Sequence, residues 1–399
     1  MRKLLALLLL SLLFGCSTKE PKIERLDGTH ISQSELTSKI QALMDSAEVT
    51  GISIAIFNDN KVAYQKSFGY SNLEKKDSLN NKTVFYGASF SKAVFGYIVA
   101  HLANDKIIEL DKPLQDYLNK PLPDFEFEKK WQGYSNLKND ERYKNITARM
   151  CLSHTTGFPN WRFLTNTGFD KNGELTINTE PGERYSYSGE GMVLLQFVIE
   201  KITGKGLEQL AREIVFDPLK MNMTSYVWQE RFEENYCNGH TIEQKVIPKD
   251  IEGDANSAGS LETTLEDYSK FISQILTEEN KKSEVTNLLF EQNIKISSKA
   301  QFGPSAFEET KENDDIDLSY GLGWGLLKSP YSFGAFKEGH SEGFQHYSIV
   351  FPEKGTGIII LSNSDNAESI FKVLLEVAIG DIFTPWKWEN YIPYNYEQK

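Results

Sequence analysis

The chain has 399 residues, of which 40% are hydrophobic and 12% aromatic, so it can bury a large core and is long enough for two or three domains. Its formal net charge of −13 argues against nucleic acid as a partner, because surfaces that bind nucleic acid are basic. The same charge disfavours direct adsorption to anionic lipid headgroups. Solubility is a sufficient explanation for the acidic balance.

The N-terminal segment MRKLLALLLLSLLFGCSTKE has the pattern of an export signal. Two basic residues precede a leucine-rich run, and this run is shorter than the roughly 20 apolar residues that span a bilayer. LFGC, which ends at Cys16, resembles the lipobox of bacterial lipoproteins, in which the cysteine is lipidated and becomes the first residue. We therefore expect a signal peptide over 1–15, then a lipidated Cys16 with a linker over 16–33. Ordinary cleavage nearby is the alternative.

The first part of the globular domain, which we expect over residues 34–385, combines a helix, a hairpin and a second helix. SELTSKIQALMDSAEV has helical spacing, with its apolar side chains on one side. GISIAIF and VAYQKSFGY alternate with period two around a polar turn, which predicts an antiparallel hairpin. ASFSKAVFGYIVAHLANDK is apolar nearly all round, which predicts a helix buried in the middle of the protein.

From about residue 110 to residue 315 the sequence is helical and rich in loops, and strands return near the C-terminus in GLGWGLL, GAFKEGH, HYSIVFPE and GIIILSNS. A last apolar helix follows, and residues 386–399 are expected to form an aromatic C-terminal extension. The pattern predicts an α+β fold with one sheet built from both chain ends and an inserted helical subdomain. A functional site would lie at the seam between these two parts.

Ser89 and Lys92 are three residues apart at the start of the buried helix, so the amine can reach the hydroxyl. Burial favours the neutral form of a lysine, which can then accept the serine proton. Unpaired backbone N–H groups and the positive end of the helix dipole would help an oxyanion to form there.

The same Ser-x-x-Lys spacing occurs twice more. Ser135 and Lys138 lie in a polar segment with no apolar helix behind them. Ser369 and Lys372 also open an apolar helix, so the spacing alone does not choose between this pair and the first.

A longer context favours Ser89. VFYGASFSKAVFGYIVAHLANDKIIELDKPLQDYL resembles the nucleophile helix of the serine β-lactamase-like superfamily, in the branch of class C β-lactamases, D-Ala-D-Ala carboxypeptidases and esterases. Further segments resemble that branch in the same order, from about Gly51 to Asn363, among them ITARMCLSHTTGFPNW, SAGSLETTLEDYSKF and GHSEGFQHYSIVFPEKGTGIIILSNS. The resemblance implies a three-layer αβα fold, a Ser89 nucleophile activated by Lys92, and a helix-capping role for Ser369.

The family's second element is a Tyr-x-Asn on a loop of the helical subdomain. The resemblance places Tyr187, in PGERYSYSGEGMVLL, on the family tyrosine and Gly189 where asparagine is usual. A phenol near a lysine ammonium can have its pKa lowered and act as a general base, or it can relay the proton to the leaving group. Gly189 lacks the amide that often contacts the acylamido group of a β-lactam, which weakens a β-lactamase interpretation.

The family's third element is a strand that carries Lys-Thr-Gly or His-x-Gly, and the resemblance places it at His340-Ser341-Glu342-Gly343. His340 stands where the cationic or hydrogen-bonding residue stands, and the Gly343 N–H would be the second oxyanion donor beside that of Ser89. Glu342 replaces a small residue. A carboxylate at the mouth of the site could favour a substrate with a free amine.

The remaining histidines and cysteines predict no second site. The resemblance makes His154, in LSHTTG, a structural residue. No histidine cluster has metal-ligand spacing and no phosphate-binding glycine loop occurs, so we expect neither a metal nor a cofactor. Cys151 and Cys237 are expected to be buried thiols, with a disulfide between them as the alternative.

These observations predict a serine hydrolase in the bacterial cell envelope. It would act on amide or ester bonds through an acyl-enzyme, with a cell-wall-type or D-amino-acid peptide, a small ester or a β-lactam as substrate. The alternative is a slowly turning-over penicillin-binding or sensing module. The expected partners are a small-molecule or peptide substrate and, through the lipid anchor, the membrane; the sequence specifies no oligomeric state.

Overall fold

The structure, a computed structural model, describes residues 20–127, 132–165, 168–251 and 253–396. The expected signal peptide and Cys16 lie outside the described residues. Among the described residues, no helix combines the length and apolar character needed to cross a membrane.

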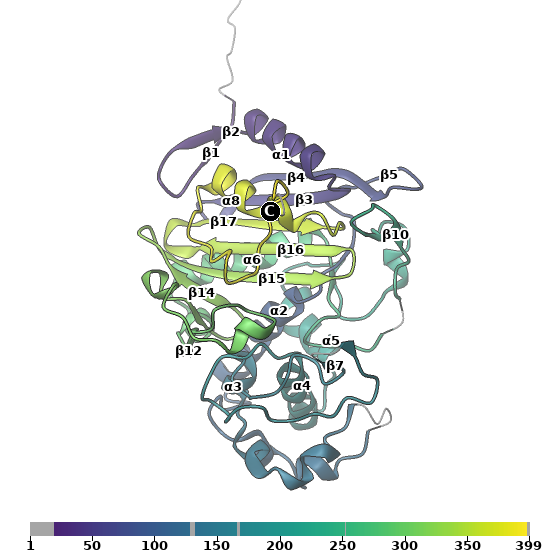
Figure 1. The fold of residues 1–399 in the computed structure, drawn as a ribbon, viewed down its shortest axis with the longest axis vertical. Helices are drawn as coiled ribbons and strands as arrows, with labels where there is room; N and C mark the ends of the chain where they lie inside the picture. Colours follow the sequence, from purple (N-terminus) through teal and green to yellow (C-terminus); the bar gives the residue numbers. More distant parts are fainter. Residues whose placement is uncertain (1–19, 128–131, 166–167, 252, 397–399) are drawn as a thin grey trace, which may run out of the picture.

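A nine-stranded antiparallel sheet forms the centre of the molecule, in the order β12-β13-β14-β15-β16-β17-β3-β4-β5 (Figure 1). Strands from the two chain ends meet inside this sheet, where Ile360 of β17 pairs with Ile54 of β3. The bounds of these strands, in the order of the sheet, are Ile294–Lys295, Ser319–Tyr320, Gly325–Lys328, Phe333–Ser341, Phe344–Phe351, Thr356–Ser362, Gly51–Asn58, Lys61–Asn72 and Asp77–Ser78.

Helices cover both faces of the sheet, each over its own apolar core. The helices α1 (Gln33–Ala47) and α8 (Phe371–Ile379) pack together on one face. The other face is covered by α2 (Phe90–Asn104) and α6 (Leu265–Asn280), with α7 (Glu284–Phe290) beside them. This arrangement confirms the predicted α+β class and the three-layer αβα fold built from both ends of the chain.

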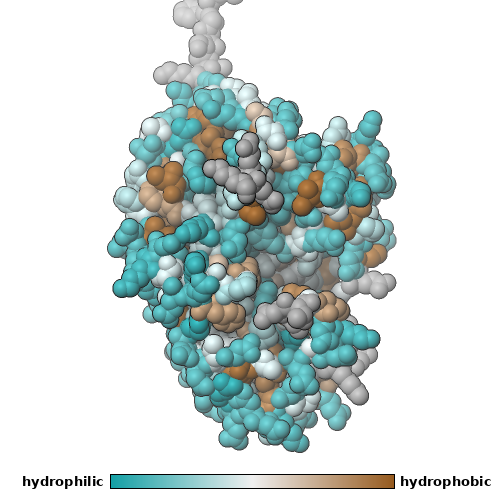
Figure 2. Space-filling view, in the orientation of Figure 1, coloured by the Kyte–Doolittle hydropathy of each residue, from teal (hydrophilic) through white to brown (hydrophobic). Residues whose placement is uncertain are grey.

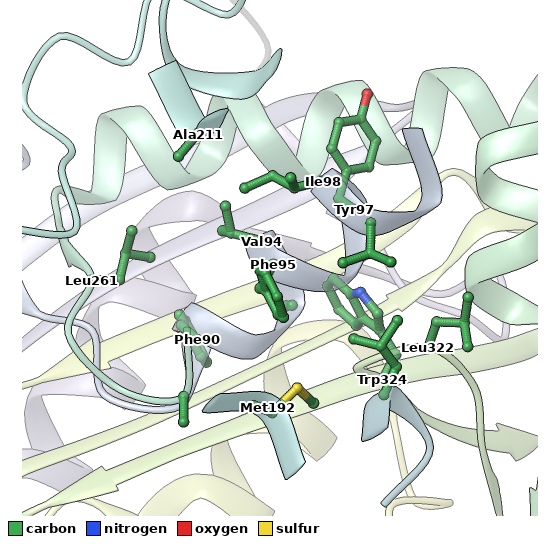
Figure 3. Packing of buried hydrophobic residues seen from close by; sticks show 14 of the residues in the cluster. Phe90, Val94, Phe95, Tyr97, Ile98, Met192, Ala211, Leu261, Leu322 and Trp324 are labelled. Carbon is green, nitrogen blue, oxygen red and sulfur yellow. The ribbon is translucent and has the colours of Figure 1, made fainter. Parts of the chain in front are cut away.

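The helix α2 is buried along nearly its whole length, as its apolar sequence predicts. Phe90, Val94 and Phe95 pack among side chains from the helical subdomain and from the segment before β14, including Met192 and Trp324 (Figure 3). The approach is close, because a Cβ atom at Gly96 would lie 2.4 Å from the carbonyl oxygen of Leu322. The start of α2 is therefore held between the sheet and the subdomain.

The helical subdomain holds α3 (Ala148–Leu152), α4 (Gly189–Thr203) and α5 (Leu207–Ala211), and it lies below the sheet in Figure 1. The predicted range of 110–315 is too wide for it, because α6 and α7 fall inside that range and belong to the layer that packs on the sheet. The short strands outside the main sheet are β1 (Lys22–Glu24), β2 (His30–Ser32), β6 (Phe85–Tyr86), β7 (Leu164–Thr165), β8 (Gly168–Phe169), β9 (Gly239–His240), β10 (Val246–Ile247) and β11 (Glu262–Thr263).

Both ends of the described chain belong to the domain, which corrects the expected linker and extension. The strands β1 and β2 pair with each other, and Ile23 and Ile31 are buried, so the part of 16–33 that is described is not a linker. Near the C-terminus, Trp386 and Trp388 are buried, and the Trp388 indole N–H donates to Ser298 Oγ at 3.1 Å.

The surface of the molecule is mainly polar, and both described cysteines are buried in its interior. Figure 2 shows a mainly hydrophilic face, with hydrophobic residues in small, separate groups. Cys151 and Cys237 are both buried, and both are free thiols, so the alternative of a disulfide between them is wrong.

Candidate active site

Ser89 stands at the N-cap of α2, directly after a strained turn. Ala88 has a φ of 45°, in a region that L-residues with a side chain seldom occupy. The Gly87 N–H donates to the Leu261 carbonyl at 2.6 Å, and Ser91 Oγ donates to the Ala88 carbonyl at 2.6 Å. These bonds hold the backbone turn that carries Ser89 at the helix start.

Lys92 is 2% exposed, and its ammonium group points back to the start of its own helix. Its Nζ atom donates to Ser89 Oγ at 2.9 Å and to the Ala258 carbonyl at 2.6 Å. Burial, and then repulsion from Lys337, lower the pKa of Lys92 well below its ordinary value. The predicted contact is therefore present, with an amine that gives up its proton readily.

Tyr187 lies between this lysine and a second one. Lys337 Nζ donates to the Tyr187 hydroxyl at 3.2 Å, and the Nζ atoms of Lys92 and Lys337 are each 5.0 Å from the centre of its ring. Lys337 is fully buried and forms an ion pair of 3.1 Å with Glu338, which in turn accepts from the Gln301 amide at 2.6 Å. The site thus joins Ser89 to a buried polar network.

The two lysines differ in protonation. Burial lowers the pKa of Lys337, but the Glu338 carboxylate and Tyr187 raise it more, so its net pKa is above the ordinary value. Lys337 therefore keeps its charge, while the pKa of Lys92 is low. The site holds one amine suited to accepting a proton and one fixed cation.

The pKa of Tyr187 corrects the expectation of an activated phenolate. Burial raises this pKa more than Lys337 and Ser89 lower it, so the phenol is protonated at neutral pH. Tyr187 can relay a proton, but it is not a pre-formed base.

His154 holds the segment on which Tyr187 lies. Its carbonyl accepts from the Ser186 N–H at 2.7 Å, and its Nδ1 accepts from the Ser188 N–H at 3.2 Å. Its ring lies 4.2 Å from that of Tyr187, and burial lowers its pKa well below the ordinary value. These contacts agree with the expected structural role, because His154 fixes Ser186 through its main-chain carbonyl and Ser188 through its neutral imidazole, on the two sides of the tyrosine.

The group beside Tyr187 on β15 is Lys337, not His340, and this is a correction. His340 has a side chain that is 39% exposed and pairs with Glu368 at 3.3 Å. Burial lowers the pKa of His340, but Glu368 raises it more, so its net pKa is above the ordinary value. Residues 337–339 read Lys-Glu-Gly, which fits a Lys-x-Gly motif three residues before the predicted one. This match in the sequence could have identified Lys337 as the site residue.

Gly343 is also not the free donor that was expected. It lies in the two-residue turn between β15 and β16 with a φ of 75°, and its N–H donates to Asp365 Oδ1 at 2.8 Å. The N–H is thus already engaged. Among the described residues, β14 pairs with β15 only as far as Phe336, so residues 337–341 form an open edge next to the site.

Gly189 is explained by Trp161. A Cβ atom at Gly189 would lie 2.7 Å from the indole ring of Trp161, and the Gly189 N–H donates to the Asn160 carbonyl at 3.0 Å. The ring thus occupies the space that the family's asparagine side chain would need.

The competing Ser-x-x-Lys pairs have other partners. Ser369 Oγ donates to the Asn366 carbonyl at 2.6 Å, while Lys372 pairs with Glu376 at 2.5 Å and is 45% exposed. Ser135 and Lys138 lie in a short 3-10 helix. The described residues contain no group of three or more His, Cys, Asp or Glu side chains arranged to hold a metal ion.

The fold and these contacts agree with the comparison with known proteins. Residues 36–378 match the Beta-lactamase family, and the chain belongs to it. Membership supports serine-hydrolase activity in general.

Two curated relatives and one solved structure are similar to the chain. Penicillin-binding protein 4* of Bacillus subtilis (strain 168) is 25% identical over 380 residues, which cover 88% of this chain and 76% of that protein. Protein flp of Staphylococcus aureus (strain MW2) is 23% identical over 365 residues, 87% of this chain, so the chain spans just under two thirds (66%) of that relative. The octameric penicillin-binding protein homologue from Pyrococcus abyssi has the same fold, with a TM-score of 0.70 at 22% identity over 91% of this chain and 80% of that one.

Proposed function

We propose that the protein is a serine hydrolase that cleaves amide or ester bonds through an acyl-enzyme on Ser89. The observation that carries the proposal is the 2.9 Å contact between the Ser89 hydroxyl and the buried Lys92, whose pKa burial holds far below that of an ordinary lysine. A neutral amine one helical turn from a hydroxyl can remove its proton during attack. Membership of the Beta-lactamase family supports the same chemistry.

The acylation step moves one proton in a closed sequence. Ser89 Oγ forms a bond to the substrate carbonyl carbon as its proton passes to Lys92 Nζ. The carbonyl π electrons move onto oxygen, where the Ser89 N–H at the helix start stabilises them. When the bond to the leaving group breaks, the proton passes from Lys92 through the Tyr187 hydroxyl to that group. Lys337 keeps its charge and holds the phenol oxygen in place.

The second oxyanion donor is, in this proposal, the N–H of His340 instead of Gly343. His340 lies on the open edge of β15, beyond the last residue that pairs with β14. Gly343 is excluded from this role because its N–H is bonded to Asp365. Deacylation repeats the sequence with water as the nucleophile and restores Ser89.

Intact-mass spectrometry after incubation with a fluorophosphonate, and separately with a penicillin, tests the nucleophile. We expect one adduct per chain on the wild type, none on Ser89→Ala, and an unchanged adduct on the matched control Ser369→Ala. A label that survives Ser89→Ala and disappears with Ser369→Ala would overturn the proposal. A stoichiometric adduct without steady-state turnover of an activated ester would select the penicillin-binding or sensing module.

We also propose that the protein is an exported lipoprotein of the bacterial envelope, anchored through Cys16. The LFGC sequence supports this, and the first described strand begins at Lys22, so the domain would lie close to the membrane surface. Such a location suits a cell-wall peptide as substrate. Metabolic labelling with an alkyne fatty acid should mark the wild type and not Cys16→Ala; equal labelling of both would refute the anchor.

A further inference from the structure

A cavity of about 540 Å³ adjoins the candidate active site, and the mechanism above does not use it. Tyr86, three residues before Ser89, lines it, as does Gly259, which follows the residue whose carbonyl accepts from the active-site lysine. Ser341 contributes from β15, just past the proposed oxyanion donor. Neither Lys92 nor Tyr187, which serve the leaving group in the proposed mechanism, lines the cavity, and we therefore assign it to the acyl side of the site.

The walls of this cavity are strongly acidic. Four carboxylates line it against a single lysine among the described residues, and they belong to Asp250, Asp254, Glu262 and Glu342, with Lys249 as the cation. Low-dielectric walls with charges of one sign concentrate the field and attract the opposite charge. The excess of negative charge favours a positively charged ligand.

Aromatic rings complete an ammonium-binding arrangement, which the protein's own Lys249 occupies. The Lys249 Nζ lies 5.1 Å from the ring centre of Tyr86, 5.4 Å from that of Trp228 and 5.8 Å from that of Phe344. These distances are within the range for cation–π attraction, and rings around an ammonium form the cages that recognise such groups. Lys249 also forms an ion pair with Glu262, and both side chains are buried, at 5% and 6% exposure.

Only one oxygen of the Glu262 carboxylate has a hydrogen-bond donor among the described residues. Its Oε1 atom binds Lys249, whereas among the described residues none donates to its buried Oε2 atom. A buried carboxylate oxygen without a donor costs free energy, which a ligand ammonium would relieve. Glu262 is held firmly, because β11 pairs with β6, and Glu262 lies opposite Tyr86 in that pairing.

We propose that this cavity receives a primary ammonium group on the acyl part of the substrate, bound by Glu262 and the three rings. This inference rests on the proposed hydrolase function and narrows its substrate to cationic acyl donors, such as esters or amides of amino acids. Lys249 then acts as an internal occupant that the ligand displaces. Glu342, at the exposed rim, adds to the attraction.

Turnover of two p-nitrophenyl esters of equal length, the 6-aminohexanoate and the heptanoate, tests the preference. We expect wild-type kcat/KM to favour the amino ester by about tenfold, the scale of a desolvated cation–π and ion-pair site. Glu262→Gln should reduce that ratio to near one, whereas Lys249→Met, which removes the competing ammonium, should raise it. The matched controls Glu213→Gln and Lys205→Met remove the same charges from an exposed ion pair and should leave the ratio unaltered.

Binding separates failure of the cavity from failure of the nucleophile. Calorimetric titration of Ser89→Ala with hexylammonium should show binding that hexanol lacks, that Glu262→Gln weakens and that Lys249→Met strengthens. Ser89-dependent turnover without an ammonium preference would overturn this inference and leave the hydrolase proposal standing. Ammonium binding without any Ser89-dependent turnover would overturn the hydrolase proposal and leave the ammonium-binding cavity standing. Preference for an acidic acyl group, lost in Lys249→Met, would show that the lysine binds a substrate carboxylate and would refute the cage.

Discussion

Two Ser-x-x-Lys pairs open helices in this molecule, and only one has the surroundings that chemistry needs. At Ser89 the lysine is 2% exposed and donates to the serine hydroxyl. At Ser369 the lysine side chain is 45% exposed and pairs with Glu376. The Ser369 hydroxyl donates to the Asn366 carbonyl and caps neither of the two helices there, so the expected capping role is wrong. The Ser-x-x-Lys spacing brings the serine hydroxyl and the lysine amine within reach of each other. Whether the lysine can act as a base depends on its burial and on the group to which it is bonded.

The largest difference should appear when each lysine is removed. Lys92→Met should slow acylation by about 10³-fold or more, because the hydroxyl loses its proton acceptor. Lys372→Met, at the exposed pair, should alter the rate less than twofold. Stopped-flow acylation by a chromogenic ester measures both. Similar losses in the two variants would remove the distinction between the sites.

The free energy of unfolding should distinguish the buried ion pair Lys337–Glu338 from the exposed ion pair Lys372–Glu376. Glu338→Ala leaves Lys337 charged, buried and without its partner, and should cost about 3–5 kcal/mol of unfolding free energy. Glu376→Ala breaks an exposed helical pair and should cost about 0.5 kcal/mol or less. Urea denaturation of both variants gives the two values. A loss below 1 kcal/mol for Glu338→Ala would mean that the buried network does not hold the site together.

The phenol should contribute less than the amine. Tyr187→Phe removes the proton relay and keeps the ring between the two lysines, so kcat should fall by about 10²-fold. The loss should be greater for an ester with a poor leaving group than for a p-nitrophenyl ester, which leaves without protonation. Equal losses for both esters would show that the Tyr187 hydroxyl does not deliver a proton to the leaving group.

Acid should lower the stability of the folded protein through the buried side chain of His346. Its Nε2 lies 2.8 Å from the Tyr86 carbonyl and its Nδ1 accepts from the Ser362 N–H at 3.1 Å, and burial lowers its pKa to about 4. Between that value and the unfolded pKa of about 6.5, the unfolded chain binds more protons. Stability from this group is therefore complete above pH 6.5 and is lost as the pH falls, by about 2 kcal/mol at pH 5.

Urea unfolding at pH 7.5 and pH 5 measures this loss, and His346→Gln is the comparison. The variant should start less stable and lose about 2 kcal/mol less between the two pH values. A wild type and a variant with the same pH dependence would contradict the assignment.

The fold could be predicted because its signals are long. The period of two in β3 and β4 and the apolar surface of α2 extend over many residues, and the structure has the sheet and buried helix that they indicate. The hairpin of β1 and β2 was missed because each strand has three residues and buries only one apolar side chain.

The candidate site was predicted where the signal was local. The Ser89–Lys92 contact needs only one helical turn, so spacing was sufficient. Lys337 was missed because both Lys-Glu-Gly and His-Ser-Glu-Gly, which begin in the same strand, can be aligned with the family motif. The residues of a strand do not by themselves determine which of them will face a distant loop. An odd shift also exchanges the two faces of the strand, which explains why His340 meets Glu368 instead of Tyr187.

The pH dependence of single-turnover acylation at Ser89 tests the central claim most directly, since it reports the protonation of the base. We expect the rate to rise through one ionisation whose pKa lies well below the ordinary lysine value of about 10.4, and then to stay level through the alkaline range. A rate that keeps rising until that ordinary value is reached would contradict this expectation, because Lys92 would then be charged when Ser89 attacks.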